Sequence, residues 1–472
     1  MPAHKSVTTL QTMCIGYVAN HIDSLCVDHG KLKKLDQRLF DSIPTVLPGN
    51  VACLNHLLNH NHHLFVVRIP FWPTIELDMS NLLNKIAEQS EGLVELRIHA
   101  FIADAFVSDV VATLSRLPRL QRLTLKLVVV SGDLITALTQ HCTELTEVTL
   151  SGSCLTEDCL DLFSTCINIE VLIINCVIAD PDATAARSLQ VLALPRLRIF
   201  RCDILTQALR LLDLSIRLSL TEYVEMNQMN LQPINALSHV LHVCPMLTTL
   251  YLHLFGNEDV EGIELLIHLR ELSLYLWPRG SGIAFMIEFQ LVLRAIGGNL
   301  KVLRLWFANL DFTNITTHCT ALEELEVCHI NWIRNFDGRQ LAPLTRLQTF
   351  KLSLTLYPFI KSPVPGLILT AFRTKLKRIE LEKCHLSDYQ FDLLLNTGRL
   401  DDLVVMRLSS VCCLSIHSLR RLMARRGGAF KLLHVFLCGR ISEEDIDGLR
   451  GMIRDLNLDV TVLTDYLEFS FF

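Results

Sequence analysis

Four histidines near the N-terminus form the densest group of potential metal ligands in this sequence. They are His56, His60, His62 and His63, and the first two are four residues apart, which would place both on one face of a helix. That spacing is compatible with zinc. No cysteine or carboxylate accompanies them in a suitable pattern, so we expect a polar, half-exposed helix end without a metal.

Motifs that carry catalysis or bind nucleotides are missing from the sequence. It contains no GxGxxG, no P-loop, no GxSxG and no HExxH. The basic segment Leu419–Arg426 (LRRLMARR) is expected to be a solvated helix face, as most charge runs are. We therefore expect a protein that has no enzymatic activity and needs no cofactor.

The composition excludes several classes of protein. Of the 472 residues, 50% are hydrophobic and 19% are charged, which excludes intrinsic disorder. The net charge of -6 argues against binding to nucleic acids. No apolar run reaches the roughly 20 residues of a membrane-spanning helix, and the first residues do not form a signal peptide. We expect no membrane segment, a cytoplasmic or nuclear location, and reduced cysteines. The 16 cysteines include no CxxC pair, so most are expected to be small buried hydrophobic residues.

A repeat organises most of the chain. The pattern apolar-x-x-apolar-x-apolar recurs about every 26 residues, within the range of about 20–29 that is typical of leucine-rich repeats. Its copies begin at Leu64, Leu93, Leu120, Leu145, Ile169, Leu197, Leu247, Leu269, Leu300, Leu322, Leu347, Leu376, Leu403 and Leu432, with a degenerate copy at Leu220.

Each copy predicts a short strand, and the stretches between copies, such as Val107–Leu114 and Ile135–Leu138, have helical spacing. One such unit cannot bury its apolar side alone, so neighbours must stack. We expect an α/β leucine-rich-repeat solenoid, a horseshoe with a parallel concave sheet, over residues 63–463 in about fifteen repeats. Ile441–Ile453 should form its last helix, with Ser442 as N-cap and Asp445 in an imperfect capping box. Leu458–Leu463 should form a closing strand, and residues 464–472 should form a cap or tail.

Cysteines recur at two places in the repeat. They precede a strand at Cys142, Cys166, Cys244 and Cys319, and they follow one at Cys154, Cys176, Cys328 and Cys384. This pattern resembles the cysteine-containing class of leucine-rich repeats, which is common in substrate receptors of ubiquitin ligases. The resemblance implies a protein-binding function.

Residues 1–62 do not fit the repeat and are expected to form a small helical module. Its segment Thr9–Val18 (TLQTMCIGYV) resembles a BC box, the elongin C-binding motif, with Thr9, Leu10, Cys14 and Val18 at the four motif positions. By this resemblance, Leu10 would enter an apolar pocket of elongin C. The plainer alternative is that the module only caps the first repeat.

A Pro-containing segment follows and is similar to a cullin box. Its matching residues are Ile43, Pro44, Leu47, Pro48, Val51 and Leu54. The order of BC box, cullin box and repeats is similar to substrate receptors of elongin–cullin ligases, such as the zygotic-defective family, although the armadillo-like repeats of that family are missing. The resemblance implies elongin C with elongin B and a cullin of the cullin 2 type as partners, because the LPxP form of the cullin 5 type is absent. Leu47–Leu58 also resembles the opening of an F-box, which leaves an F-box adaptor as the alternative.

Strand alternation selects candidate residues for binding a substrate protein. Residues between the inward leucines should point to the concave face. In the middle repeats they include aromatic and arginine side chains, the types enriched at binding hot spots. They are Tyr251, His253, Tyr275, Arg304 and Trp306, with Trp277 just beyond a strand.

Overall fold

The computed structural model of the chain describes residues from 66 to 464 with gaps. The described ranges are 66–69, 79–89, 92–127, 129–155, 159–178, 180–202, 205–224, 237–254, 260, 262–276, 283–306, 312–330, 344–354, 369, 375–425 and 429–464. They belong to two compact units. The first takes residues up to 227 together with 242–245, and the second takes 228–241 together with 246–472.

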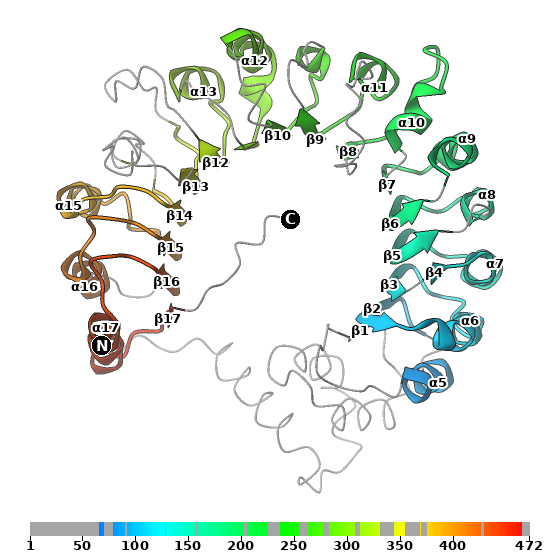
Figure 1. Ribbon diagram of the computed structural model, residues 1–472, viewed down its shortest axis with the longest axis horizontal. Helices are drawn as coiled ribbons and strands as arrows, with labels where there is room; N and C mark the ends of the chain where they lie inside the picture. The colour runs from blue at the N-terminus through cyan, green and yellow to red at the C-terminus, as the bar shows by residue number, and fades with distance from the viewer. Residues whose placement is uncertain are drawn as a thin grey trace, which may run out of the picture. The chain divides into compact units, whose positions relative to one another are not determined.

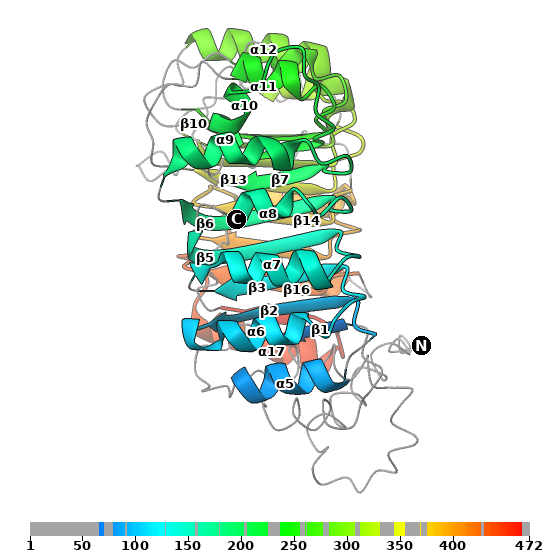
Figure 2. The same cartoon turned by 90° about the vertical axis from the view of Figure 1, so that its right-hand side faces the viewer.

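In the first unit, parallel strands alternate with helices. Strands β1, β2, β3, β5, β6, β7 and β8 pair in this order, and the two-residue β4 pairs with β5 as well. Figure 2 shows α5 to α9 stacked side by side in front of these strands. The elements are β1 (Val66–Ile69), α5 (Met79–Gln89), β2 (Glu95–Ile102), η1 (Asp104–Phe106), α6 (Val107–Leu114), β3 (Arg122–Leu127), β4 (Val129–Val130), α7 (Gly132–His141), β5 (Glu147–Leu155), α8 (Cys159–Phe163), β6 (Val171–Ile178), α9 (Pro181–Leu192), β7 (Ile199–Cys202), α10 (Leu205–Arg210) and β8 (Glu222–Val224).

The second unit continues the same alternation. Nine strands, β9 to β17, pair in parallel in chain order. In Figure 1 the helices of this unit lie along one side of the strands. The elements are β9 (Thr249–Leu254), η2 (Ile263–Leu265), β10 (Glu271–Leu276), α12 (Ile283–Ile296), η3 (Gly297–Asn299), β11 (Val302–Trp306), α13 (Phe312–His318), β12 (Glu324–Ile330), β13 (Thr349–Leu354), β14 (Arg378–Glu382), α15 (Asp388–Asn396), β15 (Val405–Ser409), α16 (Ile416–Arg425), β16 (Leu432–Phe436), α17 (Glu443–Asp455) and β17 (Thr461–Leu463). Between β8 and β9 in the sequence lies α11 (Leu237–Val243).

These strand–helix units confirm the expected α/β leucine-rich-repeat solenoid. The reason is visible in the strand register, which aligns the second and third apolar residues of each copy into two continuous buried rows. One row runs through Leu250, Leu272, Leu303, Leu325, Phe350, Ile379, Met406 and Leu433. Burial of one such side chain contributes about 1.5–3 kcal/mol, and each side chain reaches that burial only when the neighbouring repeat is in place.

The predicted start of one repeat is wrong. The sequence pattern begins the last copy at Leu432, but in the register Leu432 pairs with Val405 at the edge of the buried row. Leu433 and Val435 occupy the buried positions, and Phe430 is the buried first residue of the copy. The apolar pattern is satisfied by Phe430, Leu433 and Val435 and equally by Leu432, Val435 and Leu437. Packing selects the register that buries Phe430.

Two predicted helices are present. The helix predicted over Val107–Leu114 is α6 with the same bounds, and the helix predicted over Ile441–Ile453 is α17, which begins and ends two residues later. Ser442 accepts a hydrogen bond from the amide of Asp445 (3.2 Å), and the Asp445 carboxylate accepts one from the amide of Ser442 (3.1 Å). The predicted capping box is therefore present, with both partners satisfying amides that would otherwise lack acceptors.

The described cysteines are free thiols, and most of them are buried. Several donate a hydrogen bond to a backbone carbonyl of the preceding repeat. Cys142 donates to Leu114 (3.5 Å), and Cys384 donates to Leu352 (3.6 Å). Burial raises the pKa of Cys142 to about 12. These thiols serve packing between repeats, as expected for small buried hydrophobic residues.

Among the helices described, none combines the length and apolarity needed to cross a lipid bilayer. Residues 1–62, which are expected to form the helical module, the four histidines at 56, 60, 62 and 63, and residues 465–472 lie outside the described residues.

Candidate functional site

The residues selected by strand alternation lie on one face of the sheet in the second unit. Alternate leucines of β9 to β11 are buried against the helices, so the intervening side chains point to the opposite side, which we call the inner face. Tyr251 and His253 come from β9, Tyr275 comes from β10, and Arg304 and Trp306 come from β11. Because these strands are neighbours, the fold brings together side chains that are far apart in the sequence.

Four of these side chains pack into one group, which we call the aromatic cluster. The Tyr251 ring centroid lies 5.0 Å from that of His253 and 6.0 Å from that of Trp306. The Tyr275 centroid lies 4.9 Å from that of His253 and 6.4 Å from that of Trp306. The rings meet edge-on or tilted, as aromatic pairs prefer, so the cluster is held by its own packing.

A small residue makes this packing possible. Ser273 on β10 lies in register between Tyr251 of β9 and Arg304 of β11. Tyr251 and Trp306 belong to strands two places apart, with backbones about 10 Å from each other. A large side chain at Ser273 would stand near the path between their rings. Ser273 has no residue type that marks it as functional in the sequence, although the repeat alignment alone places it in this row.

Exposure within the aromatic cluster is uneven. His253 is only 4% exposed and Trp306 only 8%, whereas Tyr251 and Tyr275 are half-buried. The buried rings of His253 and Trp306 therefore pack against the rings of the two tyrosines and hold them in place. Tyr251 and Tyr275 are the members of the cluster that a partner can contact.

The aromatic cluster is uncharged at neutral pH. Burial lowers the pKa of His253 to about 4, so its imidazole is neutral. Burial also raises the pKa of Tyr251, with smaller contributions from Tyr275 and from the nearby Glu326 carboxylate, and it raises the pKa of Tyr275. The tyrosine hydroxyls thus remain protonated donors throughout the physiological pH range.

Beside the aromatic cluster, Arg304 is surrounded by three carboxylates. Its Nε and Nη2 donate to Oε1 of Glu324 at 3.0 and 2.8 Å. Its guanidinium also lies 3.6 Å from Glu326 and 3.9 Å from Glu271. Glu326 is also paired with Lys351, so Glu271 and Glu324 share the charge of Arg304, and this end of the inner face carries an excess of negative charge.

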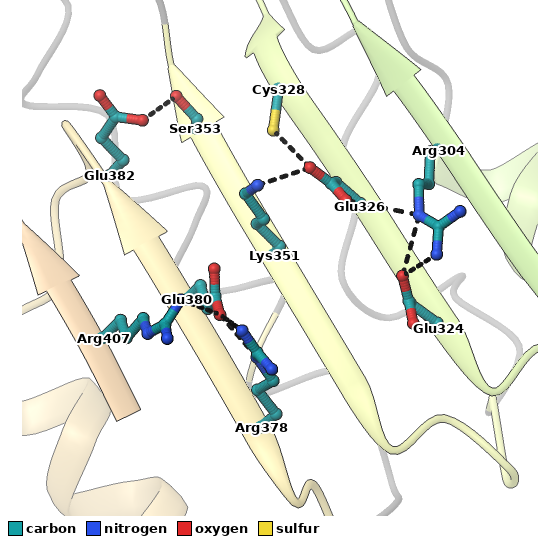
Figure 3. A network of polar contacts seen from close by, with 10 residues as sticks. All are labelled: Arg304, Glu324, Glu326, Cys328, Lys351, Ser353, Arg378, Glu380, Glu382 and Arg407. Atoms are coloured by element: carbon teal, nitrogen blue, oxygen red, sulfur yellow. Dashed lines mark hydrogen bonds and ion pairs between the residues drawn. The ribbon is translucent and has the colours of Figure 1, made fainter. Parts of the chain in front are cut away.

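Charged residues continue from Arg304 across the strands with alternating sign, in a row that we call the charge ladder. Register neighbours along it are Arg304, Glu326, Lys351, Glu380 and Arg407. Figure 3 shows this row and the side chains that contact it. Lys351 Nζ lies 2.6 Å from Glu326 Oε1, and both side chains are largely buried. Opposite charges at neighbouring positions of paired strands favour this register.

At the far end of the charge ladder the balance of charge is reversed. Glu380 Oε1 accepts a hydrogen bond from Arg378 Nε (2.6 Å) and another from Arg407 Nη1 (3.3 Å). The Glu380 side chain is 5% exposed, whereas those of Arg378 and Arg407 are 43% and 28% exposed. Two accessible guanidinium groups therefore share one buried carboxylate.

Within the described ranges, no group of three or more His, Cys, Asp or Glu side chains is arranged to hold a metal ion. Cys328, which donates to Glu326 Oε1 at 3.5 Å, is the thiol in the charge network. Burial raises its pKa well above the ordinary value, so it is a protonated thiol and a poor nucleophile.

The other predicted site residues lie outside the described residues. These are Trp277, the BC-box residues Thr9, Leu10, Cys14 and Val18, and the cullin-box residues Ile43, Pro44, Leu47, Pro48, Val51 and Leu54. Their roles remain predictions from the sequence.

No protein-family model and no characterised protein sequence matches this chain. Solved structures with a similar chain trace include an internalin from Listeria monocytogenes, with 14% identity, 94% of this chain and 99% of that chain covered, and a TM-score of 0.34. They also include a chain of the Rad7 and Elc1 complex in yeast, with 15% identity, 93% and 96% of the two chains covered, and a TM-score of 0.45. The fold assignment rests on the repeat spacing and parallel strand register of this chain.

Proposed function

We propose that this chain is a non-catalytic protein-binding repeat protein, and that its partner contacts the inner face of the second unit. The observation that carries this proposal is the aromatic cluster, in which two half-buried tyrosines stand on two buried rings. Tyrosine and tryptophan dominate binding hot spots because they offer large, rigid contact areas with a polar end.

Two features of the aromatic cluster favour a protein partner over a small molecule. The tyrosines are spread over neighbouring strands of a sheet, which offers an extended surface. The charge ladder continues this surface over further strands, through β15. Protein interfaces combine such aromatic anchors with a polar surround, whereas small-molecule sites are concave and mostly apolar.

We further propose that the protein is the substrate-recognition subunit of a cullin-RING ubiquitin ligase in the cytoplasm or nucleus. The support is the BC-box-like segment, in which Leu10 would anchor the chain to elongin C and Cys14 would lie one helical turn behind it. The cullin-box-like segment would then select a cullin of the cullin 2 type. In this arrangement the N-terminal module binds the ligase and the repeats bind the target.

An affinity capture experiment tests the protein-binding role. Full-length tagged wild type and the variant Tyr251→Ala with Tyr275→Ala are used to capture proteins from the same lysate, and the captured proteins are compared by quantitative mass spectrometry. Tyr389→Ala is the matched control, because this tyrosine is 77% exposed on α15. We expect a set of proteins that is lost with the double variant and retained with the control. If both variants retain every captured protein, the proposed inner-face site is wrong.

The ligase role needs a separate experiment with purified elongin B and elongin C. Wild type should bind the elongin complex, and Leu10→Ser with Cys14→Phe should abolish binding. Binding that is unchanged in the double variant, or absent in wild type, rejects the BC-box proposal. Recovery of the F-box adaptor in the lysate capture, without elongin binding, would select the alternative based on Leu47–Leu58. Binding to neither adaptor would leave a repeat scaffold without a ligase role.

A further inference from the structure

The charge on the inner face of the second unit is distributed unevenly along the sheet. Next to the aromatic cluster, the carboxylates of Glu271 and Glu324 are partly exposed and share the single guanidinium of Arg304. Four strands farther along, at β14 and β15, two partly exposed guanidinium groups share the buried carboxylate of Glu380. The face is therefore acidic at one end and basic at the other.

The acidic end suits a positively charged side chain. The half-buried rings of Tyr251 and Tyr275 are neutral, and their π faces attract cations within about 6 Å of the ring centroid. Glu271 contacts Arg304 only at 3.9 Å, so its carboxylate can accept hydrogen bonds from an incoming group. A lysine or arginine side chain would contact rings and carboxylates together.

The basic end suits a carboxylate. Arg378 uses Nε and one terminal nitrogen on Glu380, and Arg407 uses Nη1. Each guanidinium has five N–H donors, so both retain donors for another anion, and arginine binds carboxylates in a two-point fork. Lys383 adds positive charge nearby, although it also lies 3.1 Å from Glu382.

We propose that the inner face of the second unit binds an extended peptide segment of a partner protein, with a basic side chain at the tyrosines and an acidic side chain at Arg378 and Arg407. The proposal rests on the protein-binding function proposed above and specifies the chemistry of the partner. The observation that selects this occupant is the complementary charge at the two ends of the face.

The geometry sets the spacing within the peptide. Glu271, the carboxylate at the acidic end, and Arg378 occupy the same register position on β10 and β14, four strands apart. Because neighbouring strands are about 4.8 Å from each other, the two ends are about 19 Å apart. An extended chain advances about 3.3 Å per residue. The basic and acidic residues of the peptide should therefore be about six positions apart.

Selection from a phage-displayed library of random 12-residue peptides tests this prediction directly. The full-length chain is immobilised, and bound phage are sequenced. We expect the enriched peptides to share a lysine or arginine that lies five to seven positions from an aspartate or glutamate. Enriched peptides without this charge pair, or no enrichment at all, would overturn the proposal.

A synthetic enriched peptide then locates its acidic residue on the protein. Fluorescence anisotropy is measured for the peptide and its acid-to-alanine variant against wild type and Arg378→Gln. Each single change should weaken binding at least tenfold, and the two together should weaken it little more than one alone, since coupled changes are not additive. Arg421→Gln is the matched control, because Arg421 on α16 also forms an ion pair with a carboxylate, that of Asp392, and is similarly exposed.

The peptide variants keep the test informative even if an arginine variant folds poorly. They are measured against unaltered wild type, where loss of either charge, or deletion of three residues between the charges, should weaken binding at least tenfold. Additive effects of the acid-to-alanine change and Arg378→Gln would overturn the assignment of the acid to this site. Failure here, with tyrosine-dependent capture of partner proteins intact, would reject the charge-pair proposal and leave the protein-binding function standing.

Discussion

Glu380 and Arg304 show how single residues set the character of the inner face. The Glu380 side chain is nearly buried and forms ion pairs with two guanidinium groups, whereas the Arg304 side chain is partly exposed and lies close to three carboxylates. Removing the shared charge at either place leaves like charges next to each other. The effect should be larger at Glu380, because solvent screens its surroundings less.

Glu380→Gln should therefore destabilise the protein by about 1.5–3 kcal/mol, the size typical of losing hydrogen bonds to a charged group, because the two arginines that remain are partly solvated. The change keeps the shape of the side chain and leaves Arg378 and Arg407 without their shared carboxylate. Urea unfolding followed by circular dichroism measures the loss. Asp459→Asn removes an exposed partner of Lys431 and should cost less than about 1 kcal/mol. Equal losses in the two variants would show that the Glu380 cluster contributes no more than a surface ion pair.

His253 gives stability a dependence on pH. Burial lowers its pKa to about 4 in the folded protein, from an ordinary value of about 6.5. Between these values the unfolded chain binds more protons than the folded one, so stability is full above about pH 6.5 and falls as the pH falls towards 4. His253→Phe keeps a ring in the aromatic cluster and removes this loss. Between pH 7 and 5 the wild type should lose on the order of 1–2 kcal/mol more than the variant, measured by urea unfolding at each pH. An identical pH dependence in both proteins would contradict a buried neutral histidine.

At the scale of elements, caps determine where helices begin. The capping box of α17 joins Ser442 and Asp445 through their side chains and amides. This helix lies between β16 and β17, so the cap sets the residue at which the last described helix of the second unit begins.

Ser442→Ala should destabilise the second unit by about 1 kcal/mol, because an amide of the first turn of α17 loses its acceptor. Ser442→Thr keeps the hydroxyl, which also donates to Asp445 Oδ2 at 3.0 Å, and should leave stability within about 0.5 kcal/mol of wild type. The midpoint of urea unfolding distinguishes the two. If the alanine and threonine variants unfold at the same urea concentration, the hydrogen bonds of the capping box do not stabilise this helix.

The sequence was sufficient to predict elements and the side of the sheet on which a residue lies. Alternation placed Tyr251, Tyr275 and Trp306 on one face, because a strand has a period of two residues. It could not predict which rings touch, because that depends on small intervening residues such as Ser273. The segment FKLLHVFL (residues 430–437) fits the repeat pattern from Phe430 and also from Leu432, and only the packing of neighbouring strands selects the correct register.

At the scale of the whole molecule, the repeats of a unit are stabilised by their neighbours rather than by one central core. In the second unit, Leu305 of β11 is fully buried, and its register neighbours are Leu274 of β10 and Val327 of β12. A solenoid of this kind behaves as a chain of nearest-neighbour interactions. Damage to one repeat should therefore weaken adjacent repeats first.

Leu305→Ala should cost about 2–5 kcal/mol, the range for truncating a buried leucine, and its effect should be local. We expect amide hydrogen exchange, measured by mass spectrometry, to rise most in β10, β11 and β12 and to rise less with each strand towards β16. Leu437→Ala is the control, because Leu437 is 71% exposed and its truncation should change exchange and stability little. An equal rise in all strands of the second unit would mean that the unit opens as one cooperative block. The nearest-neighbour description would then be wrong for this unit. A destabilising change at the aromatic cluster would then raise hydrogen exchange as much in β14 and β15, the strands of Arg378 and Arg407, as in β10.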